Sequence, residues 1–222
     1  MTRFVVKVGG AVAADAARAV LPLAEKGHEV CVVHGAGPQI TAEMERRGLP
    51  VRFVGGRRAT TAAALAVVRE ALLRVNAGLC AAIGPRAVGL AGDEIGLRAL
   101  RLPGLGLVGD PLPSRPGAVC RAFADGLVPV VAPLAEGPLN VNADDAAAAL
   151  AVGLDADRIL FVTDVPGVLV DDEVVPELEA AEADRLLGDG TFAGGIVPKL
   201  QAAVRAARLG VCAEIGETAV LP

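Results

Sequence analysis

The chain has 222 residues, which is enough for one large domain or two closely joined lobes with a substantial core. Its net charge of −5 argues against non-specific binding to nucleic acid, and no apolar stretch approaches the length of a membrane span. The first residues do not resemble a secretory signal peptide. We therefore expect a cytoplasmic protein with neither a nucleic-acid nor a membrane partner.

Hydrophobic residues make up 53% of the chain, yet only 2% of the residues are aromatic. A core built from small aliphatic side chains suits helices that pack closely on a sheet. The four cysteines are scattered and form no C-x-x-C pair, so we expect neither a zinc site nor a disulfide framework. Cys31 and Cys212 lie in apolar runs and are expected to be buried thiols.

Short apolar runs alternate with helical patterns along the first half of the chain. Strands are predicted at residues 4–8, 29–33 and 87–90. Helices are predicted at residues 13–26, 38–47 and 61–82. The second of these helices has proline in its first turn, and Thr60 or Thr61 is expected to cap the third.

The second half begins with residues 98–116, which are rich in Gly and Pro and are interpreted as a hairpin lid or excursion. Strands are then predicted at residues 128–131, 159–162 and 211–215, the last of them being the final strand. Helices are predicted at residues 118–124, 143–151, 180–187 and 199–209.

This alternation predicts an α/β fold, a three-layer αβα sandwich around a mostly parallel open sheet. Ligands bind such sheets beyond the carboxyl ends of the strands. Three polar motifs follow predicted strands at that edge: Gly9-Gly10, His34-Gly35-Ala36-Gly37 and Thr163-Asp164. We therefore expect these motifs to share one site.

Only three lysines accompany eighteen arginines, and two of the three lie in glycine-flanked turns. Lys7 precedes Gly9-Gly10, and Lys199 closes the segment Gly194-Gly195-Ile196-Val197-Pro198-Lys199. An ammonium is a compact charge with freely rotating donors, whereas a guanidinium is a planar fork. Because phosphoryl transfer needs positive charge close to the moving group, the two lysines predict a phosphate site.

The two glycine turns could cradle a phosphoryl group from opposite sides. Gly9-Gly10 lies between a strand and a helix, where backbone N–H groups bind anions, and the turn after His34 repeats the arrangement. Neither turn is a dinucleotide fingerprint or a P-loop, because both spacings are absent. His34 is expected to be a structural hydrogen-bonding group rather than a base.

Several other polar residues are candidates for binding a substrate. One guanidinium of Arg57-Arg58 could pair with a carboxylate, although a solvated basic turn has the same sequence. Asn140 and Asn142 could bind a substrate or cap the following helix, and Asp144 could pair with both lysines. The turn at residues 163–168 and the loop at residues 191–199 could hold a nucleotide.

The ordered motifs resemble those of the amino acid kinase superfamily, and within it most of all the N-acetylglutamate kinases of arginine biosynthesis. The resemblance covers nearly the whole chain. It rests on Lys7-Val8-Gly9-Gly10, Val33-His34-Gly35-Ala36-Gly37-Pro38-Gln39-Ile40, Asn140-Val141-Asn142-Ala143-Asp144, Thr163-Asp164-Val165-Pro166-Gly167-Val168 and Gly194-Gly195-Ile196-Val197-Pro198-Lys199.

The resemblance implies that ATP phosphorylates the side-chain carboxylate of N-acetyl-L-glutamate, with Mg²⁺ on the nucleotide and no metal ligand from protein side chains. It implies that Lys7 and Lys199 stabilise the transferring group and that Asp144 organises both. The implied substrate-binding residues are Gly10, Gly35, Ala36, Arg58 and Asn140. The implied nucleotide-binding residues are Gly9, Thr163, Asp164, Val165, Gly167, Val168, Thr191, Gly195 and Ile196.

The resemblance also implies two lobes on one continuous sheet. Residues 1–154 would bind the acyl amino acid and form a homodimer, and residues 155–222 would bind ATP. The chain departs from the pattern at Ala36, which replaces a glycine, and at Arg57 and Arg58, either of which could grip the substrate. The N-terminal helix of arginine-inhibited relatives is absent and the segment after residue 215 is short, so we do not expect feedback inhibition.

Two alternatives stay open from the sequence. One is a kinase of lysine biosynthesis that acts on aminoadipate or glutamate linked to a carrier protein. The other is a sensor of nucleotide or amino acid with the same fold and impaired catalysis, an alternative suggested by Ala36 and the short C-terminal segment.

Overall fold

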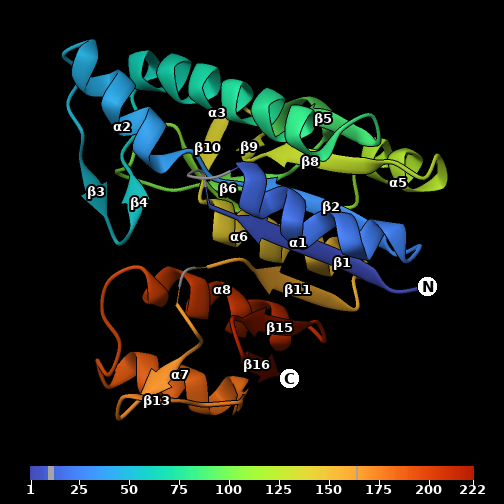
Figure 1. Ribbon diagram of the computed structural model, residues 1–222. Helices are drawn as coiled ribbons and strands as arrows, with labels where there is room; N and C mark the ends of the chain where they lie inside the picture. Colours follow the sequence, from blue (N-terminus) through green and yellow to red (C-terminus); the bar gives the residue numbers. More distant parts are fainter. Residues whose placement is uncertain (10–12, 164) are drawn as a thin grey trace.

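A sheet of eight strands runs through the centre of the molecule (Figure 1). The computed structural model describes residues 1–9, 13–163 and 165–222. The strand order is β14-β16-β15-β11-β1-β2-β8-β5, and every neighbouring pair is parallel except β15 and β16. The strands span Arg3–Val8 (β1), Glu29–His34 (β2), Ala87–Ala91 (β5), Val128–Ala132 (β8), Arg158–Phe161 (β11), Glu177–Glu179 (β14), Cys212–Ile215 (β15) and Thr218–Leu221 (β16).

Helices cover both faces of this sheet, which confirms the predicted αβα sandwich. On one face lie α1 (Ala13–Glu25) and the long α3 (Ala62–Ile83), with Thr61 as the cap of α3. The other face carries α5 (Gly117–Ala124), α6 (Ala143–Gly153), α7 (Ala180–Gly188) and α8 (Ile196–Ala207). The remaining helices of the described residues are α2 (Gly37–Arg46) and the single turn α4 (Gly92–Ile95).

The two-residue period of β1 decides which side chains face which layer. Val6 and Val8 pack in the cluster with α1 and α3, whereas Val5 packs in the cluster with α6 and α8. Because alternate side chains point to opposite faces of a strand, Lys7 lies on the same side as Val5, toward α6 and α8. The otherwise apolar strand β1 thus places the ammonium of Lys7 on the face of the sheet that α6 and α8 cover.

The segment at residues 98–116 leaves the main sheet, as its composition predicts. It supplies β6 (Ala99–Arg101) and β7 (Val108–Pro111) to a smaller sheet of four strands, ordered β6-β7-β10-β9. The other two strands are β9 (Leu134–Ala135) and β10 (Leu139–Val141). Two further antiparallel ribbons pair β3 (Phe53–Val54) with β4 (Arg57–Arg58), and β12 (Leu169–Val170) with β13 (Glu173–Val174).

The prediction that residues 211–215 form the final strand is wrong. The chain turns at Gly216, with φ of 56°, and returns as β16 between β15 and β14. Glu217 N–H donates to the carbonyl of Pro166 at 2.7 Å, and Val168 N–H donates to Thr218 Oγ1 at 2.8 Å. The return strand therefore holds the turn that follows β11. The four-residue run Thr218–Leu221 is too short to stand out in the sequence.

The cysteine predictions are confirmed in part. All four thiols are free, and Cys31 is fully buried in the core, where burial raises its pKa to about 12. Cys212 is only half-buried, which corrects the expectation that both lie inside. Its position on β15 leaves one side of the thiol near the surface charges Arg158 and Glu214.

Two glycines in helices give a matched test of this packing. A Cβ on Gly153, at the end of α6, would lie 2.2 Å from the carbonyl oxygen of Ser114, whereas one on Gly78 in α3 meets nothing within 4 Å. We expect Gly153→Ala to lower the free energy of unfolding by about 2 kcal/mol or more, because backbone must shift. Gly78→Ala should raise it by roughly 0.5–1 kcal/mol, since alanine favours helix. Urea denaturation measures both; equal effects would contradict the described packing.

Candidate active site

A buried ion pair joins β1 to α6 at the carboxyl edge of the sheet. Lys7 Nζ lies 2.8 Å from Asp144 Oδ1, and the two side chains are 7% and 9% exposed. The side chain of Asn142 caps α6 by accepting from the N–H groups of Asp144 and Asp145, at 2.8 and 3.1 Å. This cap fixes Asp144 in the first helical turn, so the carboxylate meets the ammonium with little freedom. Of the two roles that the sequence left open for Asn142, the structure shows the helix cap.

A cavity of about 220 Å³ opens on one side of this pair. Its wall comes from the turn after β2, the β3–β4 ribbon, β10 and the start of α6. The sequence-predicted residues that line it are Gly35, Ala36, Arg58, Asn140 and Asp144. The lining also includes Phe53, Ile40 and Val108, to which the sequence analysis gave no binding role. In a sequence, such apolar residues cannot be told from residues of the hydrophobic core.

Arg58 and Arg57 have different partners. Arg58 is 6% exposed and donates to the carbonyl of Gly37 at 3.1 Å and to Thr41 Oγ1 at 2.8 Å. Among the described residues it has no carboxylate partner, and burial lowers the pKa of Arg58. Arg57 instead pairs with Asp145 at 2.7 Å and with Asp110 at 3.4 Å. Of these two arginines, Arg58 is therefore the one whose guanidinium could pair with an anionic ligand in the cavity.

The ring of Phe53 supports the Arg58 side chain. The guanidinium carbon lies 4.6 Å from the ring centroid, within the range of a cation–π contact. Asn140 reaches the same strand from the other side, because its amide donates to Thr60 Oγ1 at 3.0 Å, and that hydroxyl donates to the carbonyl of Arg58 at 2.7 Å. These contacts fix two polar side chains of the cavity relative to each other.

Alanine fits without strain at position 36. Its backbone has φ of −149° and ψ of 30°, which an L-residue adopts without the left-handed region that glycine serves. The residue is 2% exposed, and its methyl group packs in a cluster with Ile40 and Met44. The replacement of glycine thus leaves the backbone N–H groups of this turn in place.

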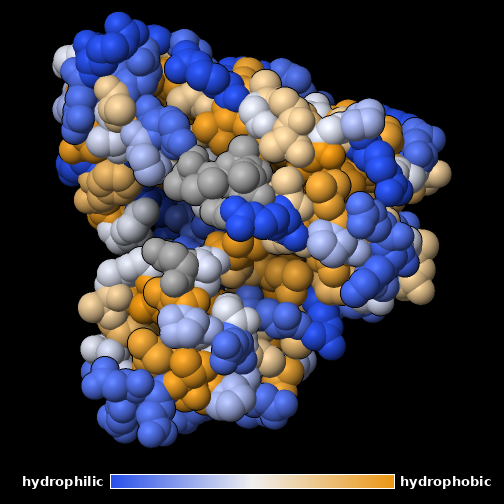
Figure 2. Space-filling model, in the orientation of Figure 1, coloured by the Kyte–Doolittle hydropathy of each residue, from blue (hydrophilic) through white to orange (hydrophobic). Residues whose placement is uncertain are grey.

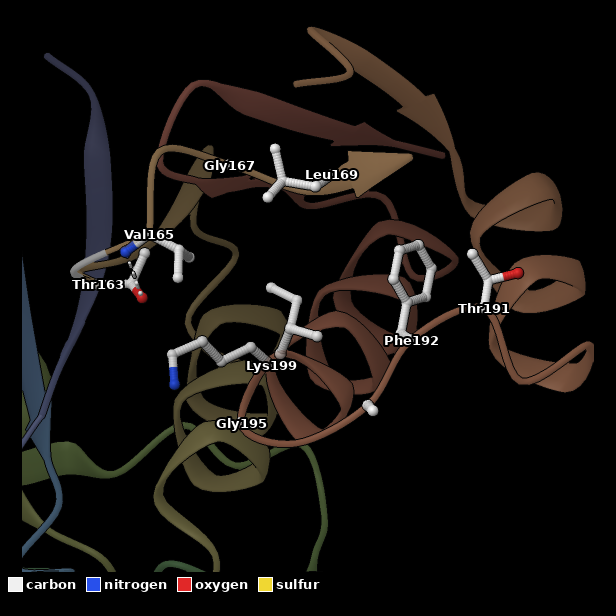
Figure 3. Close-up of a pocket in the computed structure, with 10 residues that line it drawn as sticks. Thr163, Val165, Gly167, Leu169, Thr191, Phe192, Gly195 and Lys199 are labelled. Atoms are coloured by element: carbon white, nitrogen blue, oxygen red, sulfur yellow. Dashed lines mark hydrogen bonds between the residues drawn. The ribbon is translucent and has the colours of Figure 1, made fainter. Parts of the chain in front are cut away.

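A second, larger cavity of about 440 Å³ lies in the part of the molecule that follows β11 (Figure 3). Of the sequence-predicted residues it is lined by Thr163, Val165, Gly167, Thr191, Gly195, Ile196 and Lys199. Phe192 and Ala193 of the predicted loop at residues 191–199 add apolar surface to the wall, as does Leu169, which the sequence analysis missed. Val165 and Leu169 are among the exposed large hydrophobic residues of the chain, so this wall is apolar and open.

Four other predicted residues line neither cavity or lie outside the described residues. Val168 is fully buried behind the turn, where its N–H donates to Thr218. Gly9 follows β1 and is exposed. Gly10 and Asp164 lie outside the described residues.

The two cavities approach the same end of the central strands. Lys7 and Phe161 are register partners on β1 and β11, and Val162 N–H donates to the carbonyl of Lys7 at 2.9 Å. Thr163 follows at once, and the Lys199 side chain points from the first turn of α8 toward it (Figure 3). Lys7 forms its ion pair with Asp144 at this end of the sheet.

The surface shows the same arrangement. Figure 2 shows a hollow between the upper part of the molecule, which carries α2 and α3, and the lower part, which carries α7 and α8. Asp144 lines the smaller cavity and Lys199 lines the larger one. The smaller cavity thus reaches the Lys7–Asp144 pair at Asp144, and the larger one reaches Thr163, next to the end of β1.

His34 is a buried hydrogen-bonding group, as the sequence predicts. The ring is 0% exposed; Nδ1 lies 3.3 Å from the carbonyl of Gly35, and Nε2 lies 3.1 Å from Nδ2 of Asn76. The Asn76 amide also donates to the carbonyl of Val130 at 2.8 Å, so Nε2 accepts and Nδ1 carries the proton. Burial lowers the pKa of His34 to about 4, so the imidazole is neutral near pH 7.

Within residues 1–9, 13–163 and 165–222, no group of three His, Cys, Asp or Glu side chains is arranged to hold a metal ion. None of the helices that the structure describes is long and apolar enough to cross a membrane.

Comparison with known proteins identifies the family. The family model "Amino acid kinase family" matches residues 2–215. The chain belongs to the amino acid kinase family. This amino acid kinase is 45% identical to an acetylglutamate kinase from Rubrobacter xylanophilus over 97% of its own length and 88% of the relative. It is 41% identical to an acetylglutamate kinase from Jannaschia sp., over 93% and 79% of the two chains.

Solved structures share the fold of this amino acid kinase. A crystal structure of smu.665 from Streptococcus mutans matches with a TM-score of 0.89 and 26% identity, over 99% of this chain and 98% of that one. Carbamate kinase from Giardia lamblia bound to AMP-PNP matches with a TM-score of 0.75 at 16% identity, over 99% and 98% of the two chains. At that identity the likeness supports the fold alone.

The buried imidazole predicts a pH dependence of stability. Because the pKa of His34 is about 4 in the folded chain, against an ordinary 6.5, the unfolded chain binds a proton first as pH falls. The contribution of His34 to stability is therefore complete above pH 6.5 and is lost toward pH 4, by on the order of 3 kcal/mol. The difference in free energy of unfolding between wild type and His34→Gln should shrink accordingly. A constant difference from pH 7 to 4.5 would contradict this, and His28→Gln, whose ring is half-buried, serves as the control.

Proposed function

We propose that this amino acid kinase transfers the γ-phosphoryl group of ATP to the side-chain carboxylate of N-acetyl-L-glutamate, in arginine biosynthesis. The observation that carries the proposal is the buried pair of Lys7 and Asp144, whose carboxylate lines the smaller cavity, with the larger cavity beginning at Thr163 on the neighbouring strand end. The relatives named acetylglutamate kinase, at 45% and 41% identity over most of both chains, support the choice of substrate.

The smaller cavity suits the acyl amino acid. Its volume of about 220 Å³ fits a small molecule rather than a nucleotide. Arg58 carries a buried charge, braced by Thr41 and Phe53, and a guanidinium pairs with a carboxylate through two parallel hydrogen bonds. We assign Arg58 to the α-carboxylate, Asn140 to the polar groups of the substrate, and Gly10, Gly35 and Ala36 to the reacting end.

The larger cavity suits ATP. Its exposed apolar wall, with Val165, Leu169 and Phe192, offers a surface for the base, and the glycine-rich loop before α8 leaves room for phosphates. We assign Gly9, Thr163, Asp164, Gly167, Val168, Thr191, Gly195 and Ile196 to nucleotide binding. Mg²⁺ bound to the phosphates would neutralise part of their charge, and we assign it no protein ligand.

The proposed reaction needs no general base. A carboxylate is ionised at neutral pH, so one of its oxygens attacks the γ-phosphorus directly while the bond to the bridging oxygen of ADP breaks. The products are an acyl phosphate and ADP. His34, neutral and hydrogen-bonded on both ring nitrogens, has no part in the proton balance.

Catalysis then rests on position and charge. Negative charge spreads over the phosphoryl oxygens in the transition state, and fixed ammonium groups stabilise it without reorganising. We assign Lys7 and Lys199 to this task and Asp144 to the orientation of Lys7, which it holds at 2.8 Å. We place residues 1–154 in a substrate-binding lobe and residues 155–222 in a nucleotide-binding lobe.

The assay that tests the proposal measures ADP release and traps the acyl phosphate with hydroxylamine, with N-acetylglutamate as the acceptor. Turnover of the free acid is expected. Turnover only with aminoadipate or glutamate linked to a carrier protein would favour the lysine-pathway alternative, and ATP binding without transfer would favour a sensor. Light scattering and cell fractionation test our further proposals of a homodimer and a cytoplasmic location.

Lys199→Arg tests the role of the second lysine. The change keeps the charge but replaces a compact ammonium by a planar fork, so kcat should fall by roughly 100-fold with a smaller change in the two KM values. Lys26→Arg, at an exposed lysine, is the control and should leave kcat as it is. An unchanged kcat in Lys199→Arg would remove this side chain from the chemistry.

Arg58→Lys tests the substrate grip. Loss of the two-pronged contact should raise KM for N-acetylglutamate by roughly 10- to 100-fold, with KM for ATP within about threefold of wild type. The matched control is Arg52→Lys, at an exposed arginine just before the same ribbon. If KM for ATP rises instead, the assignment of the smaller cavity to the acyl amino acid is wrong.

A further inference from the structure

Four charged side chains form a closed ring beside the smaller cavity. Arg57 lies 2.7 Å from Asp145 and 3.4 Å from Asp110. Arg205 lies 3.0 Å from the same Asp110 oxygen and 3.9 Å from the second oxygen of Asp145. Positive and negative groups alternate around the ring, so each charge has two opposite neighbours.

The ring ties three elements of the substrate side to one element of the nucleotide side. Arg57 comes from β4, Asp110 from β7 and Asp145 from the first turn of α6. Arg205 comes from α8, whose first turn carries Lys199. Arg205 is thus the one member from residues 155–222, and it lies six residues beyond Lys199 on the same helix.

Asp145 is the more buried of the two carboxylates in this ring. The Asp145 side chain is 9% exposed, and burial raises its pKa while Arg57 and Arg205 oppose that rise. A buried carboxylate left without its partners would be costly, so the ring holds both arginines to α6. The next residue back is Asp144, and the Asn142 cap fixes both carboxylates in one helical turn.

Much of the apolar contact between α6 and α8 is made by small side chains. Both helices present a run of alanines to the same core cluster, among them Ala147 and Ala151 of α6 and Ala203 and Ala206 of α8. Methyl groups form shallow ridges, which resist sliding of one helix along the other less than interdigitating large side chains do. Leu200 and Val204 of α8 pack in the same cluster, and the ring adds a directional contact that opposes sliding of α8 along α6.

We propose that Arg205 is a positioning residue: by joining Asp145 and Asp110 it fixes α8 on α6, so that Lys199 is held at the right place relative to Lys7. The inference rests on the proposed function, because it gives Lys199 a task in phosphoryl transfer. It adds a residue that touches neither cavity wall. The same ring includes Arg57, the neighbour of the proposed substrate grip, so the two sides of the site share one set of ion pairs.

Arg205→Gln is the test. We expect kcat to fall by about tenfold, with both KM values within about threefold of wild type and a melting temperature within about 4 °C. Arg205→Lys, which keeps the charge but has no fork to span two carboxylates, should give an intermediate kcat. The control is Arg208→Gln, which removes an ion pair of α8 with Asp184 of α7 and should leave kcat as it is.

A double-mutant cycle separates positioning from a general loss of structure. If Arg205 acts through Lys199, then Arg205→Gln should lower turnover by less than about twofold in a Lys199→Ala background. A full tenfold loss in that background would overturn the inference. So would an Arg205→Gln variant with wild-type kcat, or a loss of equal size in Arg208→Gln.

Backbone hydrogen exchange gives a result that does not depend on turnover. The amides at residues 198–202 should exchange faster in Arg205→Gln than in wild type or in Arg208→Gln. No difference among the three would refute the inference even if the wild type proved inactive on N-acetylglutamate. An inactive wild type would by itself refute the proposed function, so the two failures are distinguishable.

Discussion

The structure depends on one buried ammonium meeting one buried carboxylate at the end of the central strand. Lys7 and Asp144 are each nearly inaccessible, and neither charge would be tolerated there without the other. The pair fixes where β1 ends relative to α6, and through β1 it fixes the position of β11 and the turn that follows. The carboxylate of the pair lines the smaller cavity, and the turn after β11 supplies Thr163 to the larger one, so the contact bears on both cavities as well as on the fold.

The second carboxylate of the same helical turn extends this control. Asp144 holds a lysine from the strand in front of it, while Asp145 holds arginines from a ribbon and from a neighbouring helix. Negative charge in the first turn of a helix is favoured by the exposed N–H groups and the helix dipole. Two adjacent acids thereby connect β1, β4 and α8 to one helix start.

Much of this could be predicted because the deciding residues have local signatures. Val5 to Val8 alternate between two layers, and the glycine turn and the rare lysines mark the strand ends where we propose that phosphate binds. The Asn142 cap follows from its place before a helical run. These are properties of a few consecutive residues, which a sequence displays directly.

The remainder depends on contacts between distant segments. Nothing near Phe192 or Leu169 distinguishes a cavity wall from core, and the partners that separate Arg57 from Arg58 lie up to 88 residues away. The return strand β16 was also not predicted, because the run Thr218–Leu221 is recognisable as a strand only from its pairing with β14 and β15. The charge ring could not be read from spacing at all, since its four members come from four elements.

The return strand has a consequence for the order in which the protein is made. The turn at residues 165–168 shares hydrogen bonds with Glu217 and Thr218, about fifty residues later. During synthesis, β11 can join the sheet before Glu217 and Thr218 have been added, so the turn lacks these hydrogen bonds until the chain is nearly finished. The residues that line the smaller cavity end at Asp144, whereas those of the larger cavity extend to Lys199, so the growing polypeptide completes its two cavities in sequence.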